Sequence, residues 1–380
     1  MSSESKLKSW LVNDVIPLWY ENGIDRSCGF YEELDFSQKP IEQPRRTRLV
    51  SRQIYSFILA SELGWDGPYK EVVEHGINFL EKFLISQEGQ VFKSIDLKNN
   101  VIDKSHDTYD YAFLFLALAK TSLISKFRKK TLLMSENSLK WLNNNWKHKF
   151  KGYKDNTQSM SCMKANPHMH LLEAAIEWIE ISKKIKNEEI FLIWKEIGEE
   201  IVELATHKLI DNNDGSLSEY FNEEWSSEKN NLKKIIEPGH NYEWGWLLLR
   251  WEQLFKSLDL KNKAKNLILV AENHGLLRNE LACSIVDGNL NIKDKNIKLW
   301  PQTERIKAWH LLSRFEINEE KKIAQMKFED SLRSFMNFIH IPPKGMWFDL
   351  YNENTISCKK SSKASSLYHI ILAIYSIFNV

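Results

Sequence analysis

The chain has 380 residues, with 52 lysines and arginines against 51 aspartates and glutamates, so its formal net charge is +1. This balance provides no basic field of the kind that holds nucleic acid, and we expect no nucleic-acid partner. Hydrophobic residues make up 43% of the chain, as in an ordinary globular protein, and no uninterrupted apolar run approaches about 18 residues, so no membrane span is expected.

Stretches with helical periodicity follow one another along the whole chain, separated by short turns. One of them, Tyr111 to Ala119, is apolar on all sides, as in a helix that is covered on both sides. The stretch from Lys126 to Trp146 is more polar and amphipathic, as in an outer helix. The predicted helices cover residues 3–19, 46–63, 69–86, 106–120, 126–145, 166–184, 188–208, 238–258, 261–275, 301–315, 318–340 and 362–378.

Short glycine-led segments with an extended or turn pattern recur between pairs of these helices. They begin at Gly29, Gly89, Gly152, Gly215, Gly288 and Gly345, at intervals of 60, 63, 63, 73 and 57 residues. Six helical hairpins predict an all-α fold, a closed (α/α)6 barrel with short strand or turn segments at one end. An open solenoid is the alternative, but the first and last repeats show no polar capping face. No linker divides the chain, so we expect one domain over residues 1–380, with residues 1–20 packed near 362–378.

Reactive side chains recur at a similar distance after each glycine marker, near the start of the next predicted inner helix. The distances are 23, 21, 18, 25, 16 and 24 residues, for Arg52, Asp110, His170, His240, Glu304 and His369 respectively. If the ring closes, equivalent positions converge on one end of the barrel. A pocket with a few convergent polar groups is the natural candidate for a site.

Local spacing adds further candidates. In NPHMH, Asn166 shares a helical face with His170, whereas His168 points elsewhere, so no two-histidine metal face is formed. Glu243 lies three residues after His240 and can orient that imidazole or bind a ligand directly. In WPQTE, Trp300 offers a stacking plane, while Gln302 and Glu304 offer hydrogen-bonding groups.

Several motifs are missing from the sequence. It has no GxxxxGK[ST] phosphate loop, GxGxxG turn, HExxH metal motif or GxSxG nucleophile elbow, so we expect neither a cofactor nor a metal. The four cysteines are scattered without a CxxC pair, and residues 1–20 lack the apolar core of a signal peptide. We therefore expect a reduced, cytoplasmic protein without a disulfide framework.

Six segments together resemble the N-acylglucosamine 2-epimerase family: RLVSRQIYSF, YDYAFLFLALA, KANPHMHLLEA, EPGHNYEWGWLLL, KLWPQTE and SLYHI. The resemblance implies an (α/α)6 barrel and a metal-free, nucleotide-free reaction at C1–C2 of a reducing sugar. It implies acid/base roles for His240 and His369, a third active-site histidine at His170, and substrate-binding or polarising roles for Arg52, Asn166, Glu243 and Glu304. Tyr111 departs from the histidine or glutamine of many members, which predicts altered contacts at that edge of the pocket.

These residues suit isomerisation of a reducing sugar through a cis-enediolate. The resemblance implies a mannose-type sugar, or a 6-substituted derivative, as the substrate. In PRRTRLVSRQIYSF and LGWDGPY the chain resembles the mannose isomerase-like members more than the cellobiose epimerases. A 2-epimerase is the first alternative. A glycoside hydrolase using two of Asp110, Glu243, Glu304 and Asp349, or a non-enzymatic helical-repeat binding protein, are the others. The expected partner is the sugar alone, and the protein is expected to be a monomer or homodimer.

Overall fold

The computed structural model describes residues 2–154, 163–256, 260–340, 342–351 and 361–379. The chain forms two compact units, each made of segments that are distant in sequence. Unit 1 comprises Met1–Leu11, Ala205–Ser362 and His369–Val380, and unit 2 comprises Val12–Leu204 and Lys363–Tyr368. The single domain over residues 1–380 stays a prediction. None of the helices in the described ranges has the length and apolar character that a membrane span requires.

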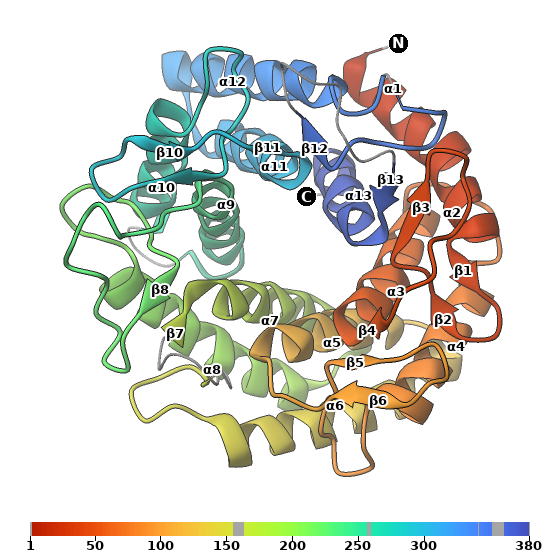
Figure 1. The fold of residues 1–380 in the computed structure, drawn as a ribbon. Coiled ribbons are helices and arrows are strands. Elements are labelled where there is room, and N and C mark those ends of the chain that lie inside the picture. Colours follow the sequence, from red (N-terminus) through yellow and green to blue (C-terminus); the bar gives the residue numbers. More distant parts are fainter. Residues whose placement is uncertain (1, 155–162, 257–259, 341, 352–360, 380) are drawn as a thin grey trace. The chain divides into compact units, whose positions relative to one another are not determined.

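Unit 2 contains two layers of helices. Helix α5 packs against α3 and α7, and each of these three inner helices packs against the outer helix that follows it in the chain (Figure 1). Because α5 is covered on both sides, its whole Tyr111 to Ala119 segment is buried, as its uniformly apolar sequence predicts. The helices are α2 (Ile16–Asn22), α3 (Thr47–Glu62), α4 (Tyr69–Phe79), α5 (Thr108–Thr121), α6 (Ser125–Trp146), α7 (Ala165–Ile185) and α8 (Glu188–Leu204).

Unit 1 repeats this packing with other helices. Helix α9 packs against α10 and α11, and α11 packs against α12. The Lys8 ammonium lies 5.1 Å from the centre of the Phe378 ring, so the first helix lies beside the end of the last one, as expected for the two chain ends. The helices are α1 (Ser3–Trp10), α9 (Pro238–Phe255), α10 (Leu260–His274), α11 (Leu299–Phe315), α12 (Asn318–Met336) and the part of α13 (Ala364–Asn379) that begins at His369.

A helix occupies each of the twelve predicted stretches over the residues that the structure describes. Three of them contain a π-helical turn that the sequence did not indicate: η1 (Leu11–Val15), η2 (Leu80–Leu84) and η3 (Ala205–Leu209). Cys28 and Cys283 are buried free thiols, whereas Cys162 and Cys358 lie outside the described residues.

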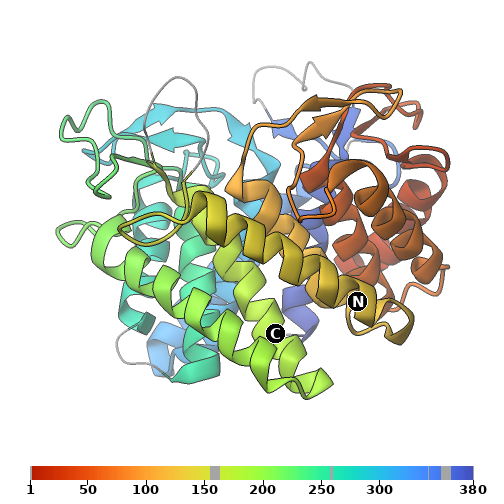
Figure 2. The same ribbon diagram turned by 90° about the horizontal axis from the view of Figure 1, so that it is seen from below.

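In each unit the short strands lie at one end of the helices (Figure 2). Strands β1 and β2 form an antiparallel pair, as do β9 and β10, while β4, β5 and β6 form a three-stranded sheet. The strands of unit 2 are β1 (Ile24–Asp25), β2 (Gly29–Phe30), β3 (Glu33–Asp35), β4 (Arg45–Arg46), β5 (Ser94–Ile95), β6 (Val101–Asp103) and β7 (Met163–Lys164). The others are β8 (Tyr220–Phe221), β9 (Ile285–Val286), β10 (Ile292–Asp294), β11 (Ile297–Lys298), β12 (Leu350–Tyr351) and β13 (Ser361–Lys363).

The glycine markers sit in tight turns, with one correction. Five adopt a positive φ, at which a Cβ is disfavoured: Gly29, Gly89, Gly152, Gly215 and Gly345. Gly288 does not belong to this set, because it lies in the later turn between β9 and β10. The equivalent position is Glu280, with a φ of 61°, in the hairpin closed by Leu276 and Ala282. The intervals then become 60, 63, 63, 65 and 65 residues, and Glu304 lies 24 rather than 16 residues after its marker.

Four of these hairpins are held in the same way. A side chain in the first turn of the following inner helix accepts a hydrogen bond from the backbone N–H that closes the hairpin. The pairs are Tyr111 with Val91 (3.0 Å), His168 with Tyr153 (2.9 Å), Asn241 with Leu217 (3.1 Å) and Gln302 with Ala282 (2.9 Å). We call these four side chains the hairpin anchors. The Tyr111 hydroxyl and the Gln302 side chain each bind backbone, whereas altered contacts at the Tyr111 edge of the pocket and hydrogen bonding of a ligand by Gln302 stay predictions.

Candidate active site

His240 lies in the first turn of α9, which begins at Pro238, a residue well suited to that position. Its Nδ1 is 2.9 Å from a carboxylate oxygen of Glu219 and 4.0 Å from one of Glu237. Burial favours the neutral ring, but the two carboxylates outweigh burial and raise the pKa of His240 to about 10. This raised pKa favours the imidazolium form of His240 at neutral pH, in which Nδ1 forms an ion pair with Glu219 and Nε2 carries the other acidic proton.

His369, in α13, also has a carboxylate behind it. Its Nδ1 lies 2.9 Å from Glu304 Oε1, and the other oxygen of Glu304 forms an ion pair with Lys307. Neither Glu304 nor Lys307 has any exposed side chain. The Lys307 ammonium also lies 4.2 Å from the centre of the Trp246 ring, a cation–π distance.

Trp300 links these two histidines. Its ring centre is 4.8 Å from that of His240 and 5.8 Å from that of His369, so both imidazoles lie against one half-buried indole. Glu243, one turn after His240 on α9, is buried, with a carboxylate oxygen within 4.8 Å of donor atoms of Glu304 and His369. Unit 1 therefore brings together five predicted site residues: His240, Glu243, Trp300, Glu304 and His369.

Two clusters in unit 1 have the donor types that a divalent cation uses. Glu219, Glu237 and His240 form one, and Glu243, Glu304 and His369 form the other. In the second cluster the Lys307 ammonium already pairs with Glu304, which places a positive charge next to any cation bound there.

In unit 2, Arg52 lies in an aromatic enclosure. Its guanidinium carbon is 4.0 Å from the ring centre of Phe113, 5.1 Å from that of Tyr368 and 5.5 Å from that of Tyr109. The side chain is buried and donates one hydrogen bond of 2.6 Å to the Tyr109 hydroxyl. Within the described ranges no carboxylate forms an ion pair with it, and its Nε has no hydrogen-bond partner. A buried guanidinium of this kind suits an electron-rich ligand.

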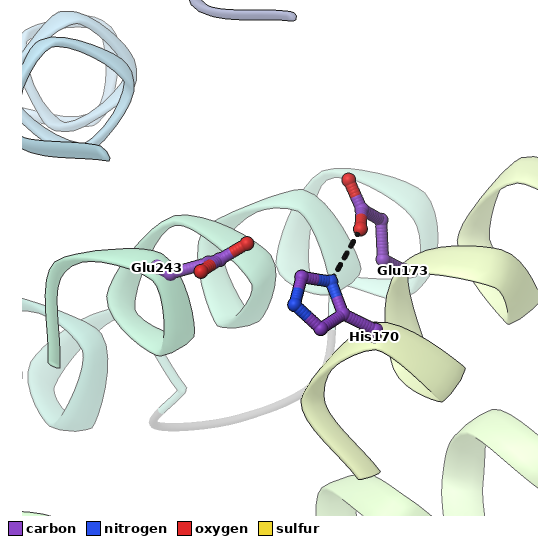
Figure 3. Close-up of side chains that lie close together, drawn as sticks. All are labelled: His170, Glu173 and Glu243. Carbon is purple, nitrogen blue, oxygen red and sulfur yellow. Dashed lines mark hydrogen bonds and ion pairs between the residues drawn. The ribbon is translucent and has the colours of Figure 1, made fainter. Parts of the chain in front are cut away.

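His170 shares these aromatic neighbours. Its Nδ1 lies 3.0 Å from a carboxylate oxygen of Glu173, one turn further along α7 (Figure 3). Glu173 also accepts a hydrogen bond from the Tyr368 hydroxyl. The ring of His170 lies edge-on to Tyr109 at 5.0 Å. Asn166 is half-buried near the start of the same helix, and its side-chain oxygen has no hydrogen-bond partner among the described residues.

The remaining predicted residue, Asp110, is engaged elsewhere. Arg48 donates to both of its oxygens, at 2.8 and 3.1 Å, and also binds Asp107. Burial raises the pKa of Asp110 to about 6, against the opposing effect of the Arg48 guanidinium. The structure does not group Asp110 with Arg52 and His170, so substrate binding by Asp110 stays a prediction that this geometry does not favour.

Sequence reasoning missed several side chains that support the site. Lys307 lies three residues after Glu304, the same helical spacing that drew attention to Glu243, and could have been found by it. Glu219 lies outside the inner helices, where no periodicity signals its role. No sequence signal distinguishes Tyr109 and Tyr368 from ordinary core aromatics.

Comparison with known proteins agrees with this geometry. Residues 29–373 match the N-acylglucosamine 2-epimerase (GlcNAc 2-epimerase) family. The chain belongs to this family. It is 29% identical to mannose-6-phosphate isomerase of Rhizobium meliloti (strain 1021) over 377 residues, which cover 98% of this chain and 96% of that protein.

Solved structures of other proteins share the fold. A D-mannose isomerase gives a TM-score of 0.85 at 20% identity, covering 98% of this chain and 97% of its own. Cellobiose 2-epimerase from Bacillus thermoamylovorans B4167 gives 0.84 at 17% identity, with 99% of each chain covered. The fold is the predicted (α/α)6 barrel, and the protein is an enzyme, a sugar isomerase or epimerase.

Proposed function

We propose that this enzyme is a cytoplasmic, cofactor-independent aldose–ketose isomerase acting at C1–C2 of a mannose-type monosaccharide, either free or substituted at C6. It interconverts mannose and fructose, or their 6-substituted forms, through a cis-enediolate, as a monomer or homodimer. The observation that carries the proposal is the pair of histidines, His240 and His369, set against Trp300 with a carboxylate on Nδ1 of each.

The chemistry needs a base for the C2 proton, an acid for ring opening and stabilisation of the enediolate oxygens. A carboxylate on Nδ1 fixes the tautomer of each ring and leaves Nε2 to exchange protons with the sugar. The indole of Trp300 offers a flat face for the apolar side of a sugar ring. In this proposal Arg52 and His170 bind sugar oxygens, and Arg52 stabilises the enediolate because its guanidinium meets no competing carboxylate in the described structure.

The likeness to mannose-6-phosphate isomerase and D-mannose isomerase supports a mannose-type substrate. The test is incubation with mannose, mannose 6-phosphate, glucose, N-acetylmannosamine, sulfoquinovose and cellobiose, followed by chromatography of the products. We expect a ketose from mannose or its 6-phosphate. Products epimeric at C2, with no ketose from any sugar, would contradict the proposal in favour of the 2-epimerase alternative.

Independence from metal is part of the proposal, although both clusters of unit 1 described above carry suitable donor atoms. We expect unchanged turnover after exhaustive dialysis against EDTA and without added nucleotide. The control is the same enzyme with magnesium, manganese or zinc added back. Loss of activity on chelation, with recovery on adding one of these ions, would show that a cluster does hold a catalytic cation.

A further inference from the structure

Lys307 lies where a lysine is rarely found. Its side chain has no exposed area, and burying an ammonium group is costly unless it is paired. Glu304 supplies the pairing charge, and Trp246 covers the ammonium on its ring face. Because the other oxygen of Glu304 meets Nδ1 of His369, Lys307 stands directly behind the carboxylate that holds this histidine.

The other histidine has a different arrangement behind it. His240 faces two carboxylates, Glu219 and Glu237, and no lysine or arginine in the described part of the chain forms an ion pair with either. Each histidine therefore has a carboxylate oxygen 2.9 Å from its Nδ1, and the two differ in the charges behind that carboxylate. Lys298 acts on Glu237 without forming an ion pair with it, whereas an ammonium pairs directly with the carboxylate that holds His369.

We propose that Lys307 is a positioning residue for His369, holding Glu304 as an aligned carboxylate while cancelling its charge, so that His369 rests as a neutral base with Nε2 as its basic nitrogen. The catalytic use of that base rests on the proposed function. The effect of the Lys307 charge on the protonation of His369 does not.

The charged groups around His369 make the consequence of removing Lys307 predictable. Glu304 faces it from α11 and Glu243 from α9. The His240 imidazolium contacts the same indole, that of Trp300, as His369 does. Without the ammonium, the negative charge near His369 is uncompensated and favours the protonated ring. The base would then be lost at a pH where the native enzyme still has it.

The test uses the full-length enzyme labelled with ¹⁵N-histidine, whose ring nitrogens report tautomer and protonation by NMR. His369→Gln and His240→Gln variants assign the signals. In the unmodified enzyme we expect His369 to titrate well below His240, with Nδ1 protonated in the neutral form. Lys307→Met and Lys307→Gln should each raise the titration midpoint of His369 by about 1 pH unit or more. The acidic limb of the kcat/KM profile should move in the same direction.

A matched control is available in unit 2. Lys120 is also buried and pairs with Glu62 and Glu177, so Lys120→Met removes a comparable ion pair from another part of the chain. It should lower stability as the Lys307 variants do, yet leave both the His369 midpoint and the pH profile unchanged.

Two results would overturn the proposal. One is an unchanged His369 midpoint in a folded Lys307 variant. The other is a native His369 that titrates together with His240, a comparison that needs no Lys307 variant to fold. Both results are NMR titration midpoints and do not depend on turnover. An enzyme that converts none of the sugars offered would contradict the proposed function but would leave the test of Lys307 unaffected.

Discussion

At the scale of single residues, a carboxylate on the far nitrogen of a histidine has two effects. It fixes which ring nitrogen faces the reaction, and it stabilises the charged ring. Glu219 and Glu304 provide this contact for His240 and His369, each at 2.9 Å. Replacing either histidine therefore removes a proton-transfer group whose orientation the surrounding helices have already set.

We expect His240→Ala and His369→Ala each to lower kcat by at least about 10²-fold, with a smaller effect on KM, because proton transfer contributes in the transition state. If the two act in one relay, the double variant should be less defective than the product of the single effects. Steady-state kinetics on the accepted sugar measures both. His168→Gln is the control, because His168 is a hairpin anchor and glutamine can still accept the N–H of Tyr153. A folded His369→Ala enzyme with near-normal turnover would remove His369 from the mechanism.

The charge on His240 also predicts how stability depends on pH. Its folded pKa of about 10 lies above its ordinary value of 6.5. The stabilisation is therefore complete below about pH 6.5 and is lost as the pH rises toward 10, with a slope of up to about 1.4 kcal/mol per pH unit. Urea unfolding between pH 6 and 9.5 should show this decline. Glu219→Gln should flatten it, whereas Glu224→Gln, an exposed change in the same segment, should not. Parallel curves for the Glu219 variant and the native enzyme would show that Glu219 does not set this charge.

At the scale of elements, the anchored hairpin is the repeating unit. We expect Tyr111→Phe to lower the free energy of unfolding by about 1–3 kcal/mol, because the buried N–H of Val91 loses its acceptor. Urea denaturation measures the loss of stability. Faster hydrogen exchange at the Val91 amide would show that the loss arises at this hydrogen bond. Tyr20→Phe serves as the control, since no backbone donor in the described ranges binds its hydroxyl. Equal stability of the Tyr111→Phe and native enzymes would mean that the anchor contributes nothing.

The elements also show why sequence reasoning succeeded in part. The helices were predictable because apolar residues recur along the sequence at helical spacing. The fifth repeat marker was placed at Gly288 because glycine is the usual residue at positive φ, whereas the turn uses Glu280 there. Supporting residues such as Glu219 were hidden for a related reason: contacts between segments that are distant in sequence leave no periodic signal. Asp110 was chosen by its repeat position, and only the structure shows that Arg48 binds it.

At the scale of the whole molecule, neither compact unit is a continuous piece of chain. Unit 2 needs Lys363–Tyr368, which supplies the Ala364 carbonyl to the Gln53 side chain at 2.9 Å and the Tyr368 hydroxyl to Glu173. A continuous fragment that ends at Leu204 therefore loses both of these contacts.

We expect a fragment of residues 12–204 to lack a cooperative unfolding transition, because each lost buried hydrogen bond costs about 1–3 kcal/mol. The full chain, under the same conditions, should unfold in one transition if residues 1–380 form a single domain. Circular dichroism with urea measures both, and addition of a peptide of residues 361–379 tests partial recovery. A fragment that unfolds cooperatively with the stability of the full chain would refute this expectation.

The hairpin anchors have a consequence for how such a chain can change over time. A phenol, an imidazole and two carboxamides perform one task in four repeats, because the task requires only an acceptor within reach of one backbone N–H. The partner in each hairpin is main chain, so the hairpin's own side chains do not enter the bond. The sequence of a hairpin can therefore change while the hydrogen bond that holds it to the helix is kept. Repeats whose residues no longer match can still be aligned by the position of this bond.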